Sequence, residues 1–449
     1  MGTSKRKLLL ILLFLMPFAA VPQEQRLSFR EADSTSYALY AAGEWKQLTR
    51  YCNRAFADSI DYYYLRMRAG IAAFETERYM RAALHFGKAL EFNAKDPVAG
   101  EYLYGCYLRL NRPDEARTIL EDLPPSVREK LEPAMPYFHR AILETGPLMS
   151  NEMTRYDTVD LDGPDDLYGE ADITLDGYYL NAGVARAFKG GYNVYLGYTL
   201  VKLNKNKIAE TGDSLSVDDQ YPLYQHQYYA SGIIPVRKNY SVQAAFHYIS
   251  NSYETVMPRL AADSVSYLYP RQAYTNSSWI GYLSVTRDLK ILKATLFGAI
   301  SSMNDVNQYQ GGFQLTAFPF GNLNLYTSSK LIDHINDNNH NFIFEQMAGV
   351  RLFRPLWLEA SATFGNMENY HENSGFVVYN IADKMTFKGN ARLIYAFHPR
   401  WTATAGYSFL VRESSYVQYL LTDDLKVERM VKTEDFQSQV ILLGLDFNF

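Results

Sequence analysis

The chain has 449 residues, a formal net charge of -5 and a mean hydropathy of -0.25. The slightly acidic balance disfavours a nucleic-acid partner, and the low hydropathy excludes a bundle of membrane-spanning helices. Tyrosine is abundant at 37 residues, which favours extended β structure or interfaces that are half wet and half apolar.

The first segment has the pattern of a secretion signal. Lys5, Arg6 and Lys7 precede an apolar run from Leu8 to Ala20, and a Val-Pro pair follows. A basic stretch before a short apolar core is typical of a signal peptide, whereas a helical membrane span needs about 20 apolar residues. We therefore assign residues 1–25 to a signal peptide, with an uncleaved anchor helix as the alternative. The mature chain is expected to leave the cytoplasm.

Residues 30 to 123 have a helical composition and repeat with a period of 34. The equivalent positions are Trp45, Tyr79 and Pro113, then Leu48, Ala82 and Ala116, then Cys52, Phe86 and Leu120. This period, with small residues at the packing points, resembles the tetratricopeptide repeat (TPR), a helix-turn-helix unit. In the middle copy the matching residues are Gly70, Tyr79, Ala82, Phe86 and Ala89. We assign residues 26–145 to a TPR-like domain of about three repeats, closed by capping helices within residues 124–144.

Stacked repeats of this kind present a concave face to a partner. The aromatic candidates for a protein partner on that face are Tyr62, Tyr63, Tyr64, Tyr102, Tyr104 and Tyr107. Ordinary packing between helices is the alternative for each of them. The two cysteines, Cys52 and Cys106, lie at different phases of the repeat, so we expect two separate buried thiols rather than a disulfide.

Residues 146–166 lose the helical period and gain Gly, Pro and Asp, so we interpret them as a domain linker. From residue 167 to residue 449 a period of two replaces it. In the segment from Trp401 to Arg412, for example, the odd-numbered residues are apolar and the even-numbered ones include Thr, Ser and Arg. Such alternation indicates strands with one apolar and one polar face.

Three features favour a closed transmembrane barrel over a soluble sandwich. Many segments reach the 9–11 residues that a tilted strand needs to cross a bilayer. Short turns alternate with long polar connections, and aromatic residues gather at the strand ends. The short turns are 189–191, 236–239, 286–290, 319–322, 354–355 and 398–400, and the long connections are 204–220, 251–276, 333–339, 368–374 and 413–432.

About 14 antiparallel strands fit the barrel segment, with 12 or 16 as alternatives. Their expected centres are near residues 171, 183, 197, 228, 245, 281, 296, 313, 327, 347, 361, 391, 407 and 442. An even number returns the chain to the side from which it entered. The fold class is therefore α + β in two domains, a helical TPR solenoid followed by an antiparallel barrel.

The last strand ends on a bare aromatic residue. Leu445, Phe447 and Phe449 share one face of the terminal alternation. This ending resembles the C-terminal signal by which outer-membrane barrels are recognised, which implies contact with the barrel-assembly machinery and with outer-membrane lipid.

The opposite parity places mixed charge toward the lumen. The lumen-facing candidates are Lys293, Lys330, Glu345, Arg351, Glu359, Lys388, Arg392 and Arg412. Those from Glu345 to Arg392 come from three consecutive strands, where they could pair across the ladder. They are either a selectivity-setting pore wall or a salt-bridged filling. No separate plug domain is evident, although long loops could fold inward.

Chemical motifs are missing from the sequence. It contains no G-x-S-x-G, H-E-x-x-H, P-loop or C-x-x-C pattern, and its histidines have no ligand spacing. His247 shares a parity with Ser241, but a lumen-facing pair would point away from lipid substrates. We therefore predict no catalytic residue, no metal and no cofactor, and the protein is not expected to be an enzyme.

Helical repeats ahead of a barrel resemble the TPR-barrel proteins of bacterial outer membranes, of which the exopolysaccharide-export porins are the best known. The resemblance implies an outer membrane of a Gram-negative (diderm) bacterium with the N-terminal domain in the periplasm. We expect an export or channel barrel whose TPR domain docks periplasmic or envelope proteins. The alternative is a non-conducting scaffold barrel, and an outer-membrane enzyme is a third hypothesis.

Overall fold

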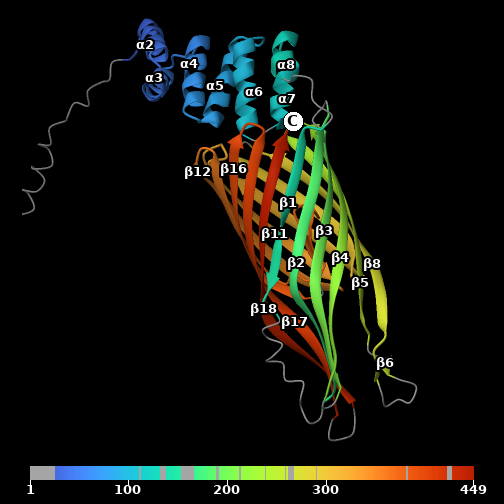
Figure 1. Cartoon of the computed structure of the whole chain (residues 1–449). Helices are drawn as coiled ribbons and strands as arrows, with labels where there is room; N and C mark the ends of the chain where they lie inside the picture. Colours follow the sequence, from blue (N-terminus) through green and yellow to red (C-terminus); the bar gives the residue numbers. More distant parts are fainter. Residues whose placement is uncertain are drawn as a thin grey trace, which may run out of the picture.

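The computed structural model describes residues 26–110, 113–131, 138–152, 166–188, 192–211, 214–237, 239–257, 259–260, 267–289, 291–380, 383–421 and 427–449. Within these residues, seven helices precede a closed barrel of fourteen antiparallel strands (Figure 1). The expected signal peptide, residues 1–25, and the expected turn at 189–191 lie outside the described residues.

The helices lie together at one end of the barrel, which we call the domain end (Figure 1). The C-terminus lies at the same end. None of the described helices is long and apolar enough to cross a membrane. The helices are α2 (Phe29–Ala41), α3 (Trp45–Ala57), α4 (Tyr63–Glu75), α5 (Tyr79–Phe92), α6 (Pro97–Arg109), α7 (Pro113–Asp122) and α8 (Pro125–Leu131).

The 34-residue period is confirmed as a stack of helix pairs. Trp45, Tyr79 and Pro113 are the first residues of α3, α5 and α7, the second helix of each pair. The other equivalent positions are buried between helices, with 2 % exposure or less: Leu48, Ala82, Ala116, Cys52, Phe86 and Leu120. Each repeat thus places one apolar face against its neighbours.

Both cysteines are free and buried, as expected, and they belong to different apolar clusters of the helical domain. Burial raises the pKa of each thiol to about 12. Neither sulfur is therefore a thiolate at neutral pH, and both act as small packing residues.

Fourteen strands of the described part pair in a closed ring in the order β1-β18-β17-β16-β13-β12-β11-β10-β9-β8-β5-β4-β3-β2. Their bounds are β1 (Arg140–Ser150), β2 (Asp166–Ala187), β3 (Asn193–Thr211), β4 (Ser214–Arg237), β5 (Tyr240–Val256), β8 (Arg271–Asp288), β9 (Leu292–Met303), β10 (Val306–Ala317), β11 (Leu325–Asn336), β12 (Asn339–Phe353), β13 (Leu356–Phe364), β16 (Lys384–His398), β17 (Trp401–Leu421) and β18 (Val427–Asn448). Two short hairpins are separate from the ring: β6 (Arg259–Leu260) with β7 (Tyr267–Leu268), and β14 (Tyr370–Glu372) with β15 (Val377–Tyr379).

The first strand corrects the expected domain boundary. Residues 140–150, placed in a capping helix and a linker, form β1 and close the barrel against β18, with Arg140 opposite Asn448. The Gly146-Pro147 pair hid this strand, because Pro lacks the N–H that a ladder uses. Glycine is required at position 146, where β1 approaches β18 closely, since an added Cβ would lie 1.7 Å from the carbonyl oxygen of Ile441.

The expected number of 14 strands is correct, but the strands are not the same ones. The chain has β1 in addition, and it has one strand fewer in the region of β2. The two strands expected near residues 171 and 183 are one strand of 22 residues, β2. The connections expected at 204–220 and 413–432 are mostly strand, because β3, β4, β17 and β18 continue through them. Their polar composition reflects strands that extend beyond the apolar band, not loops.

The long strands make the barrel asymmetric. We call the end opposite the helices the far end. There β2 to β5, β8, β17 and β18 extend beyond the shorter strands β9 to β13 (Figure 1). There β17 also pairs with β2, for example at Val417 and Glu170, so the extension closes a second time.

The barrel has an apolar outside and a polar inside. Large side chains that point outward are exposed, among them Leu196, Phe246, Leu296, Leu331, Phe342 and Leu443. Inward positions of the barrel strands are buried and polar, among them Gln225, Gln227, His247, Asn251, Ser301, Gln308 and His334. This is the reverse of a soluble sandwich, and it fits strands whose outer medium is hydrocarbon.

Candidate functional site: the barrel lumen and the helical repeats

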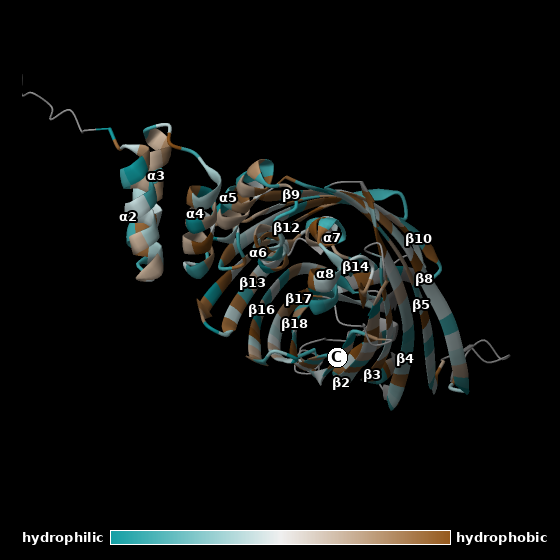
Figure 2. Cartoon of the chain, turned by 90° about the horizontal axis from the view of Figure 1, so that it is seen from above, coloured by the Kyte–Doolittle hydropathy of each residue, from teal (hydrophilic) through white to brown (hydrophobic). Residues whose placement is uncertain are grey.

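A loop of the chain itself occupies the lumen. Residues 365–380, between β13 and β16, fold inward and form the β14–β15 hairpin, which we call the lumen hairpin. The view along the barrel shows β14 inside the ring of strands (Figure 2). Its residues Tyr370, His371 and Glu372 are all buried. Residues 368–374 were expected to form a long polar connection, and this connection folds inward, an arrangement that the sequence allowed.

The turn of the lumen hairpin uses residues suited to left-handed backbone. Asn373, Ser374 and Gly375 have φ values of 51°, 60° and 79°. Asn and Gly tolerate this region best. The tip also leaves little room, because a Cβ on Gly375 would lie 3.1 Å from the side chain of Ile280.

Hydrogen bonds fix the tip of the lumen hairpin to β4 and β5. The Nδ1 atom of His247 lies 2.7 Å from the carbonyl oxygen of Gly375. The hydroxyl of Tyr229 donates to the carbonyl oxygen of Ser374 at 3.2 Å, and the Ser374 hydroxyl donates to Gln243 at 3.2 Å.

The two stems of the lumen hairpin are held by other parts of the wall. The Nε2 atom of His334 lies 2.8 Å from the carbonyl oxygen of Glu368. Asn304 donates to Asn369 at 2.7 Å, and Asn380 donates to Ser278 at 3.3 Å. The contacts thus come from several sides of the barrel.

A buried ion pair adds to this attachment. Lys388 of β16 pairs with Glu372 of the lumen hairpin, and their side chains are only 5 % and 7 % exposed. The hydroxyl of Tyr379 donates to the same carboxylate at 3.1 Å, and the ammonium of Lys388 lies 5.1 Å from the centre of the Tyr379 ring. A charge pair in such surroundings is stable only when both partners are present.

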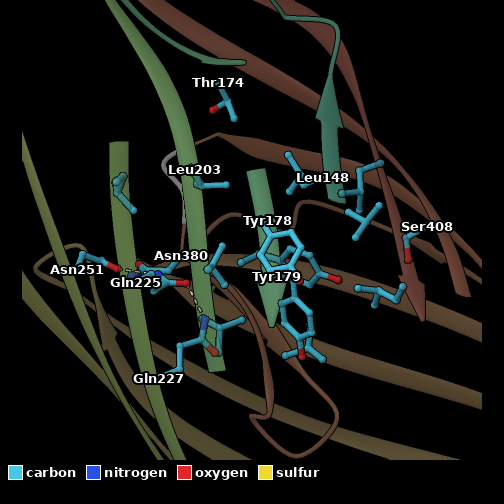
Figure 3. A pocket seen from close by; sticks show the side chains of 18 of the residues that line it. Leu148, Thr174, Tyr178, Tyr179, Leu203, Gln225, Gln227, Asn251, Asn380 and Ser408 are labelled. Carbon is cyan, nitrogen blue, oxygen red and sulfur yellow. Dashed lines mark hydrogen bonds between the residues drawn. The ribbon is translucent and has the colours of Figure 1, made fainter. Parts of the chain in front are cut away.

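Two cavities flank the lumen hairpin. One, of about 210 Å³, lies toward the far end and is lined by apolar residues such as Leu203, Leu223 and Leu410, together with Arg412. Figure 3 shows its polar wall, where Gln225 donates to Asn251 at 2.8 Å. The other, of about 400 Å³, lies toward the domain end.

The lumen candidates occupy four places: the two cavities, the wall beside Phe297 and the domain end. Glu345, Glu359, Lys388 and Arg392 line the larger cavity, and Arg412 lines the smaller one. The ammonium of Lys330 lies 4.9 Å from the centre of the Phe297 ring. Lys293 lies near the domain end, with its ammonium 3.7 Å from Asp288, and Arg351 lies at the domain end itself.

These charges find partners outside the three strands from which pairing was expected. Lys388 pairs with the lumen hairpin, and the guanidinium of Arg392 lies 3.6 Å from Glu144 of β1. Arg351 pairs with Glu77 of the helical domain at 2.9 Å. The sequence could not supply these partners, because one lies in an inward loop and another in a different domain.

The helical domain is attached to the barrel rim through one acidic residue. Glu77, in the turn between α4 and α5, contacts the guanidinium groups of both Arg351 and Arg354. Its carbonyl oxygen accepts a hydrogen bond of 3.1 Å from Asn322, in the β10–β11 turn. The views of Figures 1 and 2 together place α7 and α8 over the domain end of the barrel.

The six tyrosine candidates do not form one surface. The hydroxyls of Tyr62 and Tyr63 donate to Asp33 and Asp96, and Tyr102 stacks on the ring of Phe86. Tyr104 and Tyr107 are half-buried, whereas Tyr64 is 62 % exposed. A partner site therefore remains a prediction for which Tyr64 is the most accessible of the six.

Two residues that the sequence analysis missed extend the surface around Tyr64. The guanidinium of Arg68 lies 5.3 Å from the centre of the Tyr37 ring and 6.0 Å from that of Tyr64. Tyr37 is 58 % exposed, and Arg68 is fixed by Asp33 at 2.8 Å. We call Tyr37, Tyr64 and Arg68 the aromatic face. Spacing within one helix could not find it, because α2 and α4 supply different members.

The residues of the expected assembly signal lie on the outer surface at the domain end. Leu445 and Phe449 are 39 % and 52 % exposed. The Phe447 ring lies 4.5 Å from Trp401 and 4.8 Å from Phe449, measured between ring centres. Recognition by assembly machinery remains a prediction.

The described residues contain no group of three or more His, Cys, Asp or Glu side chains that could hold a metal ion. His247, considered with Ser241, directs one ring nitrogen to the lumen hairpin. Its geometry is that of a structural contact. Fold and site together define a membrane-type barrel that holds a hairpin in its lumen and carries a TPR-like domain at one end.

Comparison with known protein families identifies the helical part of the chain. Residues 73–134 match the family described as tetratricopeptide repeat. No curated protein sequence is significantly similar to the chain.

Several solved structures show limited similarity to the chain. A Pseudomonas aeruginosa FadL homologue has 8% identity and a TM-score of 0.45, with 70% of this chain and 90% of that chain covered. The P. putida toluene transporter TodX has 10% identity and a TM-score of 0.44, with coverage of 72% and 92%. The KdgM porin has 8% identity and a TM-score of 0.25, with coverage of 64% and 98%. At these TM-scores, no function can be transferred from them.

Proposed function

We propose that the protein is an outer-membrane barrel, closed in its resting state, that anchors a periplasmic partner through its TPR-like domain. The helices lie at one mouth of the barrel (Figure 1), and the hairpin folded into the lumen supports a closed resting state. The observation that carries the proposal is the attachment of this hairpin to the wall by an ion pair and hydrogen bonds on several sides. A simple channel needs an open polar lumen, and a hairpin attached inside the barrel argues against one.

The aromatic face is the proposed contact for the partner. Tyr and Arg are enriched at the energetic centres of protein interfaces, because they combine large contact area with hydrogen bonding. Arg68 is already oriented by Asp33, so little side-chain entropy is lost on binding. The partner we infer is a periplasmic or envelope protein that presents an extended segment with apolar and acidic side chains.

The first test of closure is single-channel recording of the full chain in a planar bilayer. We expect inserted barrels to stay silent. A variant in which residues 366–380 are replaced by a short Gly-Ser link should conduct steadily. Stable conductance of the unaltered chain would contradict the closed state.

The second test addresses the partner. A photo-crosslinking residue at Tyr64 should trap one defined protein in intact cells, and Tyr37→Ala with Arg68→Gln should abolish the product. The matched control is the same crosslinker at Phe92, which is 53 % exposed on α5. Equal products from both positions would contradict a partner specific to the aromatic face.

A second function, a gated export channel, is favoured by one observation. Cavities of about 210 and 400 Å³ lie on the two sides of the lumen hairpin, and both are lined by Phe376, Val377 and Tyr379. Displacement of this one segment would join them. Conductance that appears only when the partner is added would support the gated channel over the scaffold.

A further inference from the structure

A third cavity lies between the helical domain and the rim of the barrel. Its volume is about 520 Å³, within the range of roughly 300–1,000 Å³ that is usual for ligand sites. One wall is the α4–α5 turn with the start of α5, and the other wall comes from the β8–β9 and β10–β11 turns. The lining residues are Thr76, Glu77, Arg78, Met80, Arg81, Ile291, Pro319, Phe320, Gly321, Asn322 and Asn324.

The position of this junction cavity is at the edge of the apolar band. Phe320 is 64 % exposed and Ile291 is 47 % exposed, and both belong to turns that end outward-facing apolar strands. Phe353, at the end of β12, is 59 % exposed. Aromatic residues at strand ends lie at the level of the lipid headgroups in membrane barrels.

The charge of the junction cavity is positive. Arg78 and Arg81 line it with exposed side chains. Glu77 also lines it, but the carboxylate of Glu77 is engaged by Arg351 and Arg354. The two lining arginines therefore face the cavity without that carboxylate to neutralise them. Arginine suits phosphate because its planar guanidinium donates two parallel hydrogen bonds.

We propose that the junction cavity binds an anionic phospholipid of the adjoining leaflet, with its phosphate on Arg78 and Arg81 and its acyl chains along Phe320 and Ile291. A free phosphate would leave the exposed apolar half of the site unused. A bound lipid would join the α5 side of the helical domain to the barrel rim. The proposal rests on the membrane placement inferred above, but not on a partner or on the state of the lumen.

The test uses the full chain in nanodiscs of phosphatidylcholine with increasing phosphatidylglycerol, followed by native mass spectrometry to count retained phosphatidylglycerol. Each arginine at a membrane surface contributes about fivefold to the affinity for anionic lipid, so Arg78→Gln with Arg81→Gln should weaken retention about 30-fold. The matched control, Lys46→Gln with Arg50→Gln on α3, removes the same charge from exposed positions outside the cavity and should retain phosphatidylglycerol as the unaltered chain does.

Two further arms identify the source of the phosphate. Phe320→Ser should also reduce retention of phosphatidylglycerol, and inorganic phosphate at millimolar concentration should not displace it. Equal retention in the cavity and control variants would overturn the proposal, as would full displacement by inorganic phosphate. A conducting barrel would contradict the closed state without affecting this result, whereas failure to enter nanodiscs would contradict the membrane placement itself.

Discussion

At the scale of single residues, the lumen hairpin depends on charges that are stable only in pairs. Lys388 and Glu372 are both more than nine-tenths buried, so each would be an isolated charge without the other. Removal of one partner of a buried pair typically costs about 3–5 kcal/mol, whereas replacement of both by apolar residues is often neutral. The hairpin is therefore expected to stay in the lumen only while neither charge of the pair is left without the other.

We predict that Lys388→Met alone releases the lumen hairpin, because Glu372 then gains more from water than from its buried position. Single-channel recordings should show frequent openings in this variant. The double variant Lys388→Met with Glu372→Met should be quieter than the single one. Equal silence in all three proteins would mean that the ion pair does not hold the hairpin.

A second residue-scale prediction concerns His85 in the helical domain. Burial, and next the nearby guanidinium of Arg66, lower the pKa of His85 to about 4, and Arg66 lies 3.2 Å from its Nδ1 atom. The unfolded chain takes up a proton near pH 6.5, whereas the folded domain does so only near pH 4. The stability that the neutral ring contributes is therefore complete above pH 6.5 and is lost as the pH falls toward 4, by about 2–3 kcal/mol.

Hydrogen exchange of the α4 and α5 amides at several pH values measures this loss. His85→Gln cannot titrate, so its protection should change much less between pH 6.5 and 4. An unchanged pH dependence in that variant would assign the effect to other groups.

At the scale of elements, close packing of the repeats requires glycine at one helical position and does not require it at another. A Cβ on Gly70 of α4 would lie 2.7 Å from the Phe86 ring, whereas a Cβ on Gly87 of α5 would meet nothing within 4 Å. Both lie inside helices, where Ala is intrinsically better than Gly by roughly 1 kcal/mol. The two positions therefore form a matched pair.

We predict that Gly70→Ala destabilises the helical domain by about 1–3 kcal/mol, since the ring of Phe86 must move in a filled core. Gly87→Ala should stabilise the domain by about 0.5–1 kcal/mol. Urea unfolding followed by hydrogen exchange of the helices gives both values. A loss of stability in both variants would contradict the packing explanation.

The elements that the sequence predicted well are those with a sustained period. The 34-residue repeat located the helical domain, and alternation located most barrel strands. β1 was missed because Gly146 and Pro147 break its pattern, although its partner β18 was expected near residue 442. Polar residues at 204–220 suggested a loop, because alternation at a barrel's far end no longer reflects contact with lipid.

The candidate site was less predictable than the fold. Parity identified Lys388, Glu345 and Arg392 as inward residues, but their surroundings depend on where residues 365–380 fold. Asn373, Ser374 and Gly375 indicate a tight turn, and a turn has the same sequence inside a barrel as outside it. Long-range partners of this kind are absent from any local pattern.

At the scale of the whole molecule, Glu77 links the two domains among the residues that the structure describes. This residue lies in the α4–α5 turn, and its carboxylate connects the repeats to Arg351 and Arg354 of the rim. Its side chain is 22 % exposed, so water screens the ion pairs only in part. The aromatic face is then held at a fixed position relative to the domain end of the barrel.

We predict that Glu77→Gln loosens this junction while both domains stay folded. Hydrogen exchange should accelerate about fivefold in residues 76–81 and 319–324, which corresponds to about 1 kcal/mol for a partly exposed ion pair. The helix cores should keep their protection. Glu75→Gln, an exposed position two residues earlier, is the matched control and should change nothing. If Glu77→Gln behaves like this control, the rim contact does not fix the domain, and the helical repeats are free to follow their partner.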